Sequence, residues 1–369
     1  MLSGRRSALL LLALGALAGL CAALLPLAPT ASASTGSVTS PGGPGPASDP
    51  LANRPWGIYT GGADGVYPAY QSATDPAQKA LLAKVALRPR VRWFGSHNPA
   101  DQIGAKIRDY ISTTQGGDPG VVVQMAMFRL WPHGEKHKLD PLTDADRAAY
   151  RHWVNNAAAA IGSSRVAMVL EPDLAVSLTG WHPWVRLHLA AYAAKKFGSL
   201  PHTSVYLDAA DSDWLSASKA ASMVRKAGIQ YVRGFALGAT HYTGVSADID
   251  HGRAVAHILA QAGLPHHFVI DTADNGRPFT WKQYWQMHPQ GDFSNAQTCA
   301  TTTQTRCDTL GIPPTADVDN PRWRLSATRQ RIAHRLVDGY LWFGRPWLVD
   351  QASPFSLSRT LAVAASTPW

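Results

Sequence analysis

Carboxylic acids stand directly after several short apolar runs of this sequence. Glu171 and Asp173 follow one such run, Asp208 and Asp271 follow two others, and Asp350 comes a few residues after a fourth. If these runs are parallel strands of one barrel, their carboxyl ends converge on the face where barrel active sites are built. A single acid at a strand end usually caps the next helix or bonds a loop amide. Helix capping and loop bonding do not readily explain several converging acids. We expect some of these acids to be structural and others to be catalytic.

Converging carboxylates without paired histidine ligands suit the hydrolysis of a glycosidic bond. That reaction needs one carboxylic acid that stays protonated and protonates the leaving oxygen, and a second carboxylate that acts as base or nucleophile. Isolated histidines such as His97, His241 and His288 are interpreted as surface residues or as satisfied loop residues. No metal ligands and no bound cofactor are expected.

A cleft for sugars should also present aromatic faces, because the C–H faces of pyranose rings stack on indole. The sequence has 13 Trp residues, several of them just past the ends of apolar runs. We predict that Trp93, Trp214 and Trp342 contact substrate, with Trp214 first because it lies shortly beyond Asp208. A place in the core explains any one of these tryptophans equally well.

The elements that would position these residues alternate along the chain. Short β-branched or apolar runs, typical of buried strands, occupy 91–94, 121–128, 166–170, 204–207, 231–235, 267–270 and 340–343. Alanine-rich stretches with helical spacing occupy 144–161, 183–197, 216–227, 245–262 and 326–337. Strands that are apolar on both faces and followed by helices indicate a parallel sheet covered by helices. No Gly-x-Gly-x-x-Gly follows the first strand, which argues against dinucleotide binding. With about seven such units, the pattern favours a closed parallel α/β barrel over an open sheet.

The N-terminus predicts export. Arg5 and Arg6 precede an uncharged run rich in Leu and Ala, and small residues at 31–33 suit a signal peptidase. We therefore expect a signal peptide over 1–33, a Gly/Pro/Ser-rich leader or linker over 34–52, the barrel over 53–369, and a secreted product. An uncleaved membrane anchor is the alternative, because the apolar run is about long enough to span a bilayer.

Two cysteines, Cys299 and Cys307, lie beyond the predicted leader, eight positions apart. In an oxidising compartment they are expected to form a disulfide that closes one loop, with two free thiols as the alternative. The formal net charge of +9 is spread along the chain and interleaved with acids. Nucleic-acid binding is therefore not predicted, because it needs a basic stripe. We expect a monomer.

From about Trp56 to Gln351, the sequence resembles glycoside hydrolase family 6, the cellobiohydrolases and β-1,4-endoglucanases. The resemblance is carried by a series of segments in the order of the family: Tyr150-Arg151-x-Trp153, Ala160-Ile161-Gly162, Val169-Leu170-Glu171-Pro172-Asp173, Val205-Tyr206-Leu207-Asp208-Ala209 with Trp214, Ala227-Gly228-Ile229, Arg233-Gly234-Phe235-Ala236, Phe268-Val269-Ile270-Asp271-Thr272 with Asn275-Gly276, and Gly311 with Pro314-Thr315.

This resemblance implies a distorted α/β barrel and a reaction that inverts the anomeric centre. Asp173 takes the place of the general acid, and Asp208 that of an aspartate beside the reacting sugar. Asp350 is the candidate base. Arg129 and Asn275 are carried over as substrate-binding residues.

The sequence also departs from the family pattern around these positions. Leu130 stands where the family has the aspartate that partners the general acid, and Gln124 replaces a tyrosine of the same strand. Removing a nearby anion weakens the effect that keeps Asp173 protonated, although an apolar neighbour partly restores it by desolvation. The remaining replacements are Asp211 for a His, Asp274 for an Arg, Thr298 for a Trp, Gly344 for a Lys, Leu348 for a Glu, Gln351 for a Gly, and Gly238 and His241 in an Asn-rich turn.

Three functions follow from these observations. The first is a secreted inverting hydrolase of β-1,4-glucan, with a polysaccharide or oligosaccharide as its partner. The second is the same fold acting on a different cell-envelope β-glycan. The third is a catalytically impaired barrel that binds carbohydrate.

Overall fold

Seven parallel strands form the centre of the molecule in a computed structural model that describes residues 49–369. They are hydrogen-bonded in chain order: β1 (Arg92–Gly95), β2 (Val123–Phe128), β3 (Val166–Leu170), β4 (Thr203–Asp208), β5 (Gly234–Leu237), β6 (His267–Asp271) and β7 (Val337–Leu341). The predicted distorted barrel of about seven parallel strands is therefore confirmed. The predicted signal peptide and most of the predicted leader lie outside the described residues.

The edge strands β1 and β7 approach each other without pairing as a ladder. The N–H of Val91 donates to the carbonyl of Trp342 at 2.9 Å. The indole N–H of Trp93 donates to the carbonyl of Phe343 at 2.8 Å. These bonds join the two edges of the curled sheet at residues beside the strands, so the ends of β1 and β7 hold each other in place.

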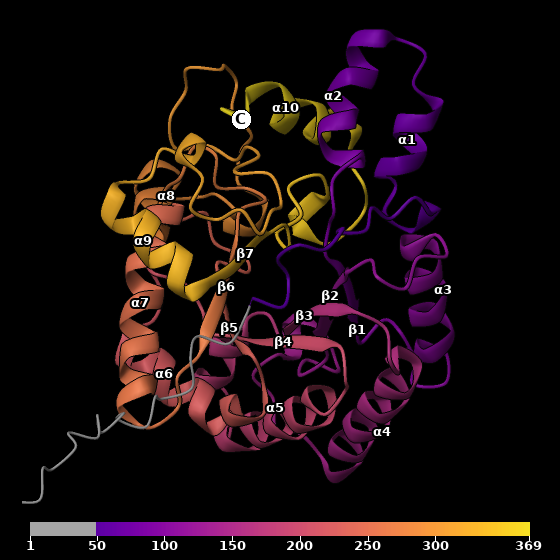
Figure 1. Ribbon diagram of the computed structural model, residues 1–369, viewed down its shortest axis with the longest axis vertical. Helices are drawn as coiled ribbons and strands as arrows, with labels where there is room; N and C mark the ends of the chain where they lie inside the picture. Colours follow the sequence, from indigo (N-terminus) through magenta and orange to yellow (C-terminus); the bar gives the residue numbers. More distant parts are fainter. Residues whose placement is uncertain (1–48) are drawn as a thin grey trace, which may run out of the picture. The chain divides into compact units, whose positions relative to one another are not determined.

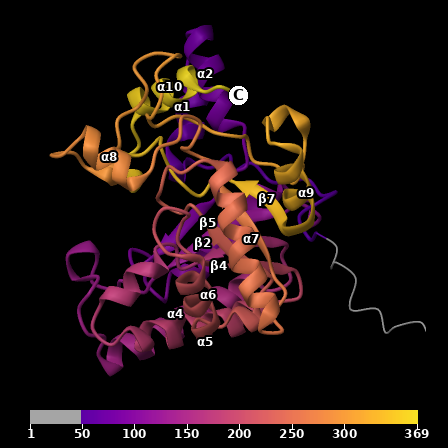
Figure 2. The ribbon, with the colours of Figure 1, turned by 90° about the vertical axis from the view of Figure 1, so that its left-hand side faces the viewer.

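Helices follow the strands around the outside of the barrel (Figure 1). These are α3 (Ile103–Gln115), α4 (Asp144–Ile161), α5 (Pro183–Gly198), α6 (Ala217–Lys226), α7 (Val245–Gln261) and α9 (Ala327–Leu336). A second group consists of α1 (Val66–Ser72), α2 (Pro76–Ala86) and α10 (Leu357–Ser366), which lie together in both views (Figures 1 and 2). Lys84 Nζ fastens this group by donating to the carbonyl of Ala364 at 3.0 Å. The short helix α8 (Trp281–Met287) lies apart from both groups.

Local sequence explains where the helices begin. Thr143 caps α4 by accepting the N–H of Asp146, whose side chain accepts the Thr143 N–H in return. The buried face of α4 recurs at helical spacing through Tyr150, Trp153, Val154, Ala157, Ala158 and Ile161. This strong pattern is why α4 matches its predicted bounds.

Both faces of the sheet are buried, as the apolar runs predicted. One face packs against the outer helices through residues such as Met168, Leu207 and Phe268. The alternate residues, such as Val169 and Tyr206, fill the interior of the barrel. The carboxyl ends of the strands are thereby held rigidly at one face.

Two predicted strands differ from the structure. β5 begins at Gly234, later than predicted, because Gly228 with φ 94° starts a short 3₁₀ turn over Ile229–Tyr231. β7 begins earlier, at Val337, and contains a buried Asp338 that reads as a loop residue in the sequence. The Arg233 guanidinium pairs with Asp338 at 2.8 Å, which makes this charge tolerable inside the barrel.

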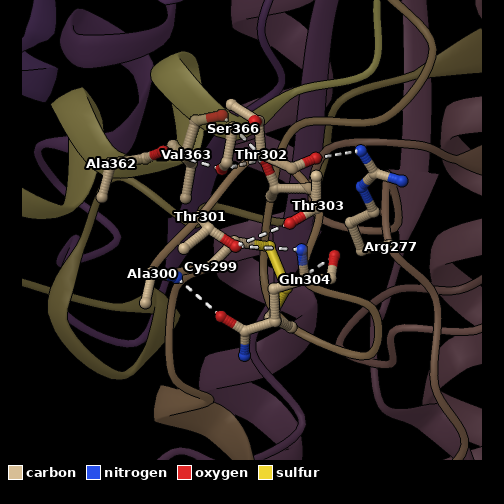
Figure 3. Close-up of a disulfide and its surroundings, with 12 residues drawn as sticks. Arg277, Cys299, Ala300, Thr301, Thr302, Thr303, Gln304, Ala362, Val363 and Ser366 are labelled. Atoms are coloured by element: carbon tan, nitrogen blue, oxygen red, sulfur yellow. Dashed lines mark hydrogen bonds between the residues drawn. A yellow bond between two sulfur atoms is a disulfide. The ribbon is translucent and has the colours of Figure 1, made fainter.

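The predicted disulfide between Cys299 and Cys307 is confirmed (Figure 3). Its loop is braced by further bonds: Gln304 Oε1 accepts the N–H of Ala300 at 2.7 Å, and Arg277 donates to the carbonyl of Thr302 at 2.5 Å. Within residues 49–369, no helix combines the length and apolar character needed to cross a membrane.

Candidate active site

The turn after β3 carries two acids in left-handed backbone conformations, Glu171 with φ 53° and Asp173 with φ 63°. Glu171 is fully buried, and its Oε2 accepts the N–H groups of Arg129 at 3.0 Å and Leu130 at 3.1 Å. The Tyr150 hydroxyl donates to Oε1 at 2.7 Å. Burial raises the pKa of Glu171 to about 7, against the opposing effect of these bonds. Glu171 therefore anchors the end of β2 to the end of β3.

Asp173, two residues further on, is half-buried and has one oxygen held by a neighbouring loop. Thr240, which follows β5, donates its hydroxyl to Asp173 Oδ1 at 2.7 Å. Burial raises the pKa of Asp173, while the Thr240 bond and the nearby His241 oppose the rise. A carboxyl group with a raised pKa and a partly open position is suited to donating a proton.

Asp208 ends β4 and is fully buried beside Asp173. Its Oδ2 accepts the N–H groups of Leu174 at 3.1 Å and Ala210 at 3.3 Å, while its buried Oδ1 has no hydrogen-bond partner among the described residues. Burial raises the pKa of Asp208 well above its usual range, and the charge of Asp173 adds to the rise. The two carboxyl groups are therefore linked electrostatically.

A third set of polar groups lies in the loops after β4 and β5, and the sequence interpretation missed it. His241 Nδ1 lies 2.7 Å from Asp213 Oδ1 and 4.0 Å from Asp211 Oδ2. Thr243 donates to Asp211 at 2.6 Å and to Asp248 at 2.9 Å. Burial lowers the pKa of His241, but the bond to Asp213 and the charges of Asp211, Asp213 and Asp173 outweigh it, and the net shift is upward. His241, treated as an ordinary loop residue from the sequence, is thus tied electrostatically to Asp173.

The same loops contain residues that could hold a metal ion. The ligand atoms of Asp211, Asp213 and His241 lie within 4.8 Å of one another. The short His241–Asp213 hydrogen bond already satisfies two of the three groups. A metal would have to displace that bond, so we derive no chemistry from this group.

Two more acids follow β6 and face the loop after β7. Asp271 accepts backbone N–H groups from Ala273, Phe343 and Gly344. Both carboxyl oxygens of Asp274 are buried and without hydrogen-bond partners among the described residues. Burial raises the pKa of Asp274 well above its usual range, and Asp271 adds to the rise. A Cβ at Gly344 would stand 2.6 Å from Asp274 Oδ2, so this close approach requires a glycine.

Asp350, the predicted base, lies on a short 3₁₀ segment over Val349–Gln351 and is exposed, with φ 51°. Its neighbour Gln351 is buried and fixes this segment. Gln351 accepts the Arg345 N–H at 3.2 Å and donates to the Tyr242 hydroxyl at 3.2 Å. The segment is therefore well anchored while the carboxylate of Asp350 faces solvent.

A cavity of about 460 Å³ opens beside these loops. Its wall includes Trp93, Phe128 and Arg345, together with residues of the N-terminal segment such as Tyr59. Arg345 is also close enough to Asp173 and Asp271 for both charges to raise its pKa, against the stronger effect of burial. Arg345 thus links the wall of the cavity electrostatically to the carboxylates of Asp173 and Asp271.

The family model of glycosyl hydrolases family 6 matches residues 59–324, which is more than half of the chain. The chain belongs to glycosyl hydrolases family 6.

Relatives within family 6 agree with this membership. Endoglucanase A of Cellulomonas fimi is 29% identical over 223 residues, which are 60% of this chain and 47% of that protein. Endoglucanase 1 of Streptomyces halstedii is 30% identical over 209 residues, 55% of this chain and 63% of that protein. The matched segments thus span about half to two thirds of these relatives. The structure of endoglucanase Cel6 from Mycobacterium tuberculosis, in complex with a thio-linked methyl cellobiosyl-cellobioside, shares the fold with a TM-score of 0.67 at 24% identity, covering 86% of this chain and 99% of that one.

The family 6 departure at Leu130 has a structural explanation. Leu130 is 2% exposed in the core, its N–H donates to Glu171, and its carbonyl accepts from Arg186 at 3.2 Å. An apolar side chain here adds to the desolvation of the turn that holds Asp173. Asp208 is the acidic residue that lies beside Asp173 here.

The three tryptophans that were predicted to contact sugar in this family 6 chain lie in different environments. Trp342 is 1% exposed and donates to the carbonyl of Ile312, so it belongs to the core and presents no face to a ligand. Trp93 lies at the cavity with Arg345 over its ring at 3.9 Å. Trp214 is half-buried with the His241 ring stacked on it at 4.9 Å.

The two polar residues predicted to bind substrate also make internal contacts. Asn275 is buried and donates to the carbonyls of Thr243 and Asp271, which positions the loop after β6. Arg129 reaches the carbonyl of Ser96 at 3.3 Å and lies over the Trp153 ring at 5.6 Å.

Proposed function

We propose that this chain is a secreted glycoside hydrolase that cleaves β-1,4-linked glucan chains with inversion, Asp173 acting as general acid and Asp350 as base. Family membership and the relatives named as endoglucanases support the reaction class. A related structure holds a cellobioside analogue, which supports a glucan as partner.

The observation that carries the proposal is the environment of Asp173. Burial raises its pKa, and Thr240 fixes the orientation of one oxygen. Within residues 49–369 the second oxygen has no hydrogen-bond partner, which suits it to face the glycosidic oxygen. Asp208, whose pKa burial raises well above the usual range, lies beside it. General acid catalysis needs this combination of a retained proton and a fixed direction of donation.

In the proposed reaction, Asp350 takes a proton from a water molecule as that water attacks the anomeric carbon. Asp173 gives its proton to the leaving oxygen on the opposite side, and one sugar chain leaves as an alcohol. Inverting enzymes place the two carboxyl groups about 6.5–9.5 Å apart to leave room for the water. The anchored but exposed position of Asp350 suits such a role once substrate covers it.

A second candidate is favoured by the surroundings of the tryptophans. Arg345 covers the ring of Trp93 and His241 covers that of Trp214. A flat neutral glucan chain would find both stacking faces occupied. This arrangement favours the same hydrolytic chemistry on a different β-linked cell-envelope glycan.

The test is a screen of soluble β-glycans with the wild type, Asp173→Ala and, as matched control, Asp109→Ala on the exposed side of α3. We expect release of reducing ends by the wild type and the control, and none by Asp173→Ala. No turnover of any β-glycan, together with saturable oligosaccharide binding, would instead support the impaired binding barrel.

The base and the stereochemistry need separate experiments. NMR of the first products from a β-linked substrate should show the α-anomer, and an initial β-anomer would contradict inversion. Asp350→Ala should lose turnover and regain part of it with added azide, because a strong external nucleophile does not need the base. Secretion is tested by the mature N-terminus in the culture medium, expected at Ser34.

A further inference from the structure

Two arginines on the wall of the 460 Å³ cavity have no acceptor for their side chains. Arg92 begins β1, and Arg345 follows Gly344 after β7. Within residues 49–369, neither guanidinium forms a hydrogen bond or an ion pair, and Arg92 Nη1 and Arg345 Nε are buried atoms. Buried donors without partners are rare in native proteins because each costs its full desolvation penalty. Two such donors on the wall of one cavity make it a candidate site for an anionic ligand.

Aromatic rings hold both guanidinium groups in place. Arg92 lies 5.2 to 5.4 Å from the ring centroids of Tyr59, Phe94 and Tyr110. Arg345 lies 3.9 Å from that of Trp93. These contacts orient the arginines and leave the N–H edges of the guanidinium planes without acceptors.

The lining of the cavity carries an excess of positive charge. Asp64 is the one acid among the described residues that line it, and it pairs with a third arginine, Arg90, at 2.6 Å. On the rim, burial lowers the pKa of His97, and the charges of Lys106, Arg345 and Arg92 lower it further. His97 therefore stays neutral at pH 7, and the charges of Arg92 and Arg345 remain uncompensated within the lining.

The cavity has room for sugar rings but lacks an open platform for a neutral one. Its volume falls in the range of small-molecule binding sites. The ring of Trp93, where a pyranose would stack, is occupied by Arg345. A sugar that carries a carboxylate gains what a neutral glucose lacks, because guanidinium groups bind carboxylates through paired, charge-assisted hydrogen bonds.

We propose that this cavity binds a uronic-acid residue of a β-linked glycan, with Arg92 and Arg345 donating to its carboxylate. This inference rests on the proposed glycan hydrolase function and names its substrate class: an acidic β-glycan in place of plain β-1,4-glucan. Arg345 lies within electrostatic reach of both the cavity and Asp173, so an acidic sugar bound here would hold the chain across the reacting carboxylates.

The test is a comparison of two tetrasaccharides on the intact protein carrying Asp173→Asn, which should slow turnover enough for binding to be measured. One is cellotetraose, and the other is the same β-1,4 chain oxidised at C6 to glucuronic acid. Titration calorimetry at low salt should show the acidic chain binding at least about tenfold more tightly, a difference that shrinks at high salt. Adding Arg92→Gln or Arg345→Gln should remove most of the preference, and adding both should abolish it.

Arg345→Gln should also affect the binding of the neutral chain. Because it uncovers the Trp93 ring, affinity for neutral cellotetraose should stay equal or rise, which loss of a merely structural residue would not produce. Arg345→Met, which keeps the apolar stem, should behave as Arg345→Gln if the protein folds normally by thermal unfolding. Arg331→Gln, on the exposed side of α9, should keep the full preference.

Equal affinities for the two chains, or a preference that survives the double arginine variant, would overturn the inference. This result is distinguishable from failure of the proposed function. Absence of hydrolysis of either chain by the wild type would overturn the hydrolase assignment, whereas the binding comparison is made on a variant that needs no turnover.

Discussion

Asp208 Oδ2 accepts the backbone N–H of Leu174 at 3.1 Å, so the acid that ends β4 holds the residue directly after Asp173. The same carboxyl group lies close enough to Asp173 for that charge to raise the pKa of Asp208. One side chain therefore positions the turn of the proposed proton donor and is also linked to that donor electrostatically.

Asp208→Asn should separate these two roles. The amide oxygen can still accept the Leu174 N–H, whereas the titrating neighbour of Asp173 is lost. We expect kcat/KM at neutral pH to fall by about tenfold or more, with the alkaline limb of its pH profile moved to lower pH. An unchanged profile at reduced activity would limit Asp208 to a structural role, and Asp109→Asn serves as control.

Tyr150→Phe should destabilise the fold through Glu171. The Tyr150 hydroxyl donates to the fully buried Glu171 Oε1 at 2.7 Å, and its loss leaves a buried carboxyl oxygen without that donor. The expected cost is about 1–3 kcal/mol in the free energy of unfolding by denaturant titration. Tyr192→Phe, which removes a solvent-exposed hydrogen bond to Asn155, should cost much less. Equal effects of the two variants would contradict the buried anchor.

Stability should fall as the pH rises from about 4 to 8. Burial raises the pKa of Asp271 and of Asp308 to about 8, and that of Glu171 to about 7. The folded protein then binds more protons than the unfolded chain, whose acids titrate near pH 4, and stability is lost as the pH approaches 8. Thermal unfolding should give a Tm that is several degrees higher at pH 5 than at pH 8.

Asp274→Asn tests this origin of the pH dependence. Its two buried oxygens have no hydrogen-bond partners within residues 49–369, and its pKa lies well above the usual range. The amide is neutral at every pH, so the variant should match the wild type at pH 5 and exceed its Tm at pH 8. A uniform loss at both pH values would refute the explanation, with Asp109→Asn as the exposed control.

Removing the disulfide should cost moderate stability without affecting the site. Cys299 and Cys307 close a loop with a sequence separation of 8, for which the chain-entropy relation gives about 2.5 kcal/mol. The double Cys→Ala variant should show this loss by denaturant titration while keeping KM. A changed KM in the folded variant would indicate that the loop contributes to substrate binding.

The sequence predicted the barrel well because its strongest signals are local. α4 begins at a Thr143 cap and buries one helical face, and β3 is an unbroken apolar run, so both have the predicted bounds. The start of β7 was predicted too late in the chain. A charged residue such as Asp338 is typical of a loop when its ion pair with Arg233 is not known. Arg233 lies far from Asp338 along the chain, so no local sequence pattern predicts that the two residues pair. The helices α1, α2, α3, α8 and α10 were not predicted, although α3 buries Ile103, Ile107, Tyr110 and Ile111 at helical spacing.

The site was predictable only in part, for a similar reason. Strand-end positions brought Asp173 and Asp208 together as expected. His241 and Arg345 gave no signal of their own, because their importance comes from what they touch: Asp213 in one case and the Trp93 ring in the other. The spacing of Trp342 suggested a platform, whereas its side chain packs in the core. The departures from the family pattern, such as Gly344 in place of a Lys, indicated a changed cleft without showing which residues would line it.

The proton-donor role of Asp173 is tested most directly by the dependence on leaving group. A leaving group that departs readily needs no proton, so Asp173→Asn should hydrolyse a dinitrophenyl β-glycoside of the preferred oligosaccharide at a rate close to that of the wild type. The same variant should lose about 10²-fold or more in kcat on the unactivated oligosaccharide. An equal loss on both substrates would contradict general acid catalysis by Asp173.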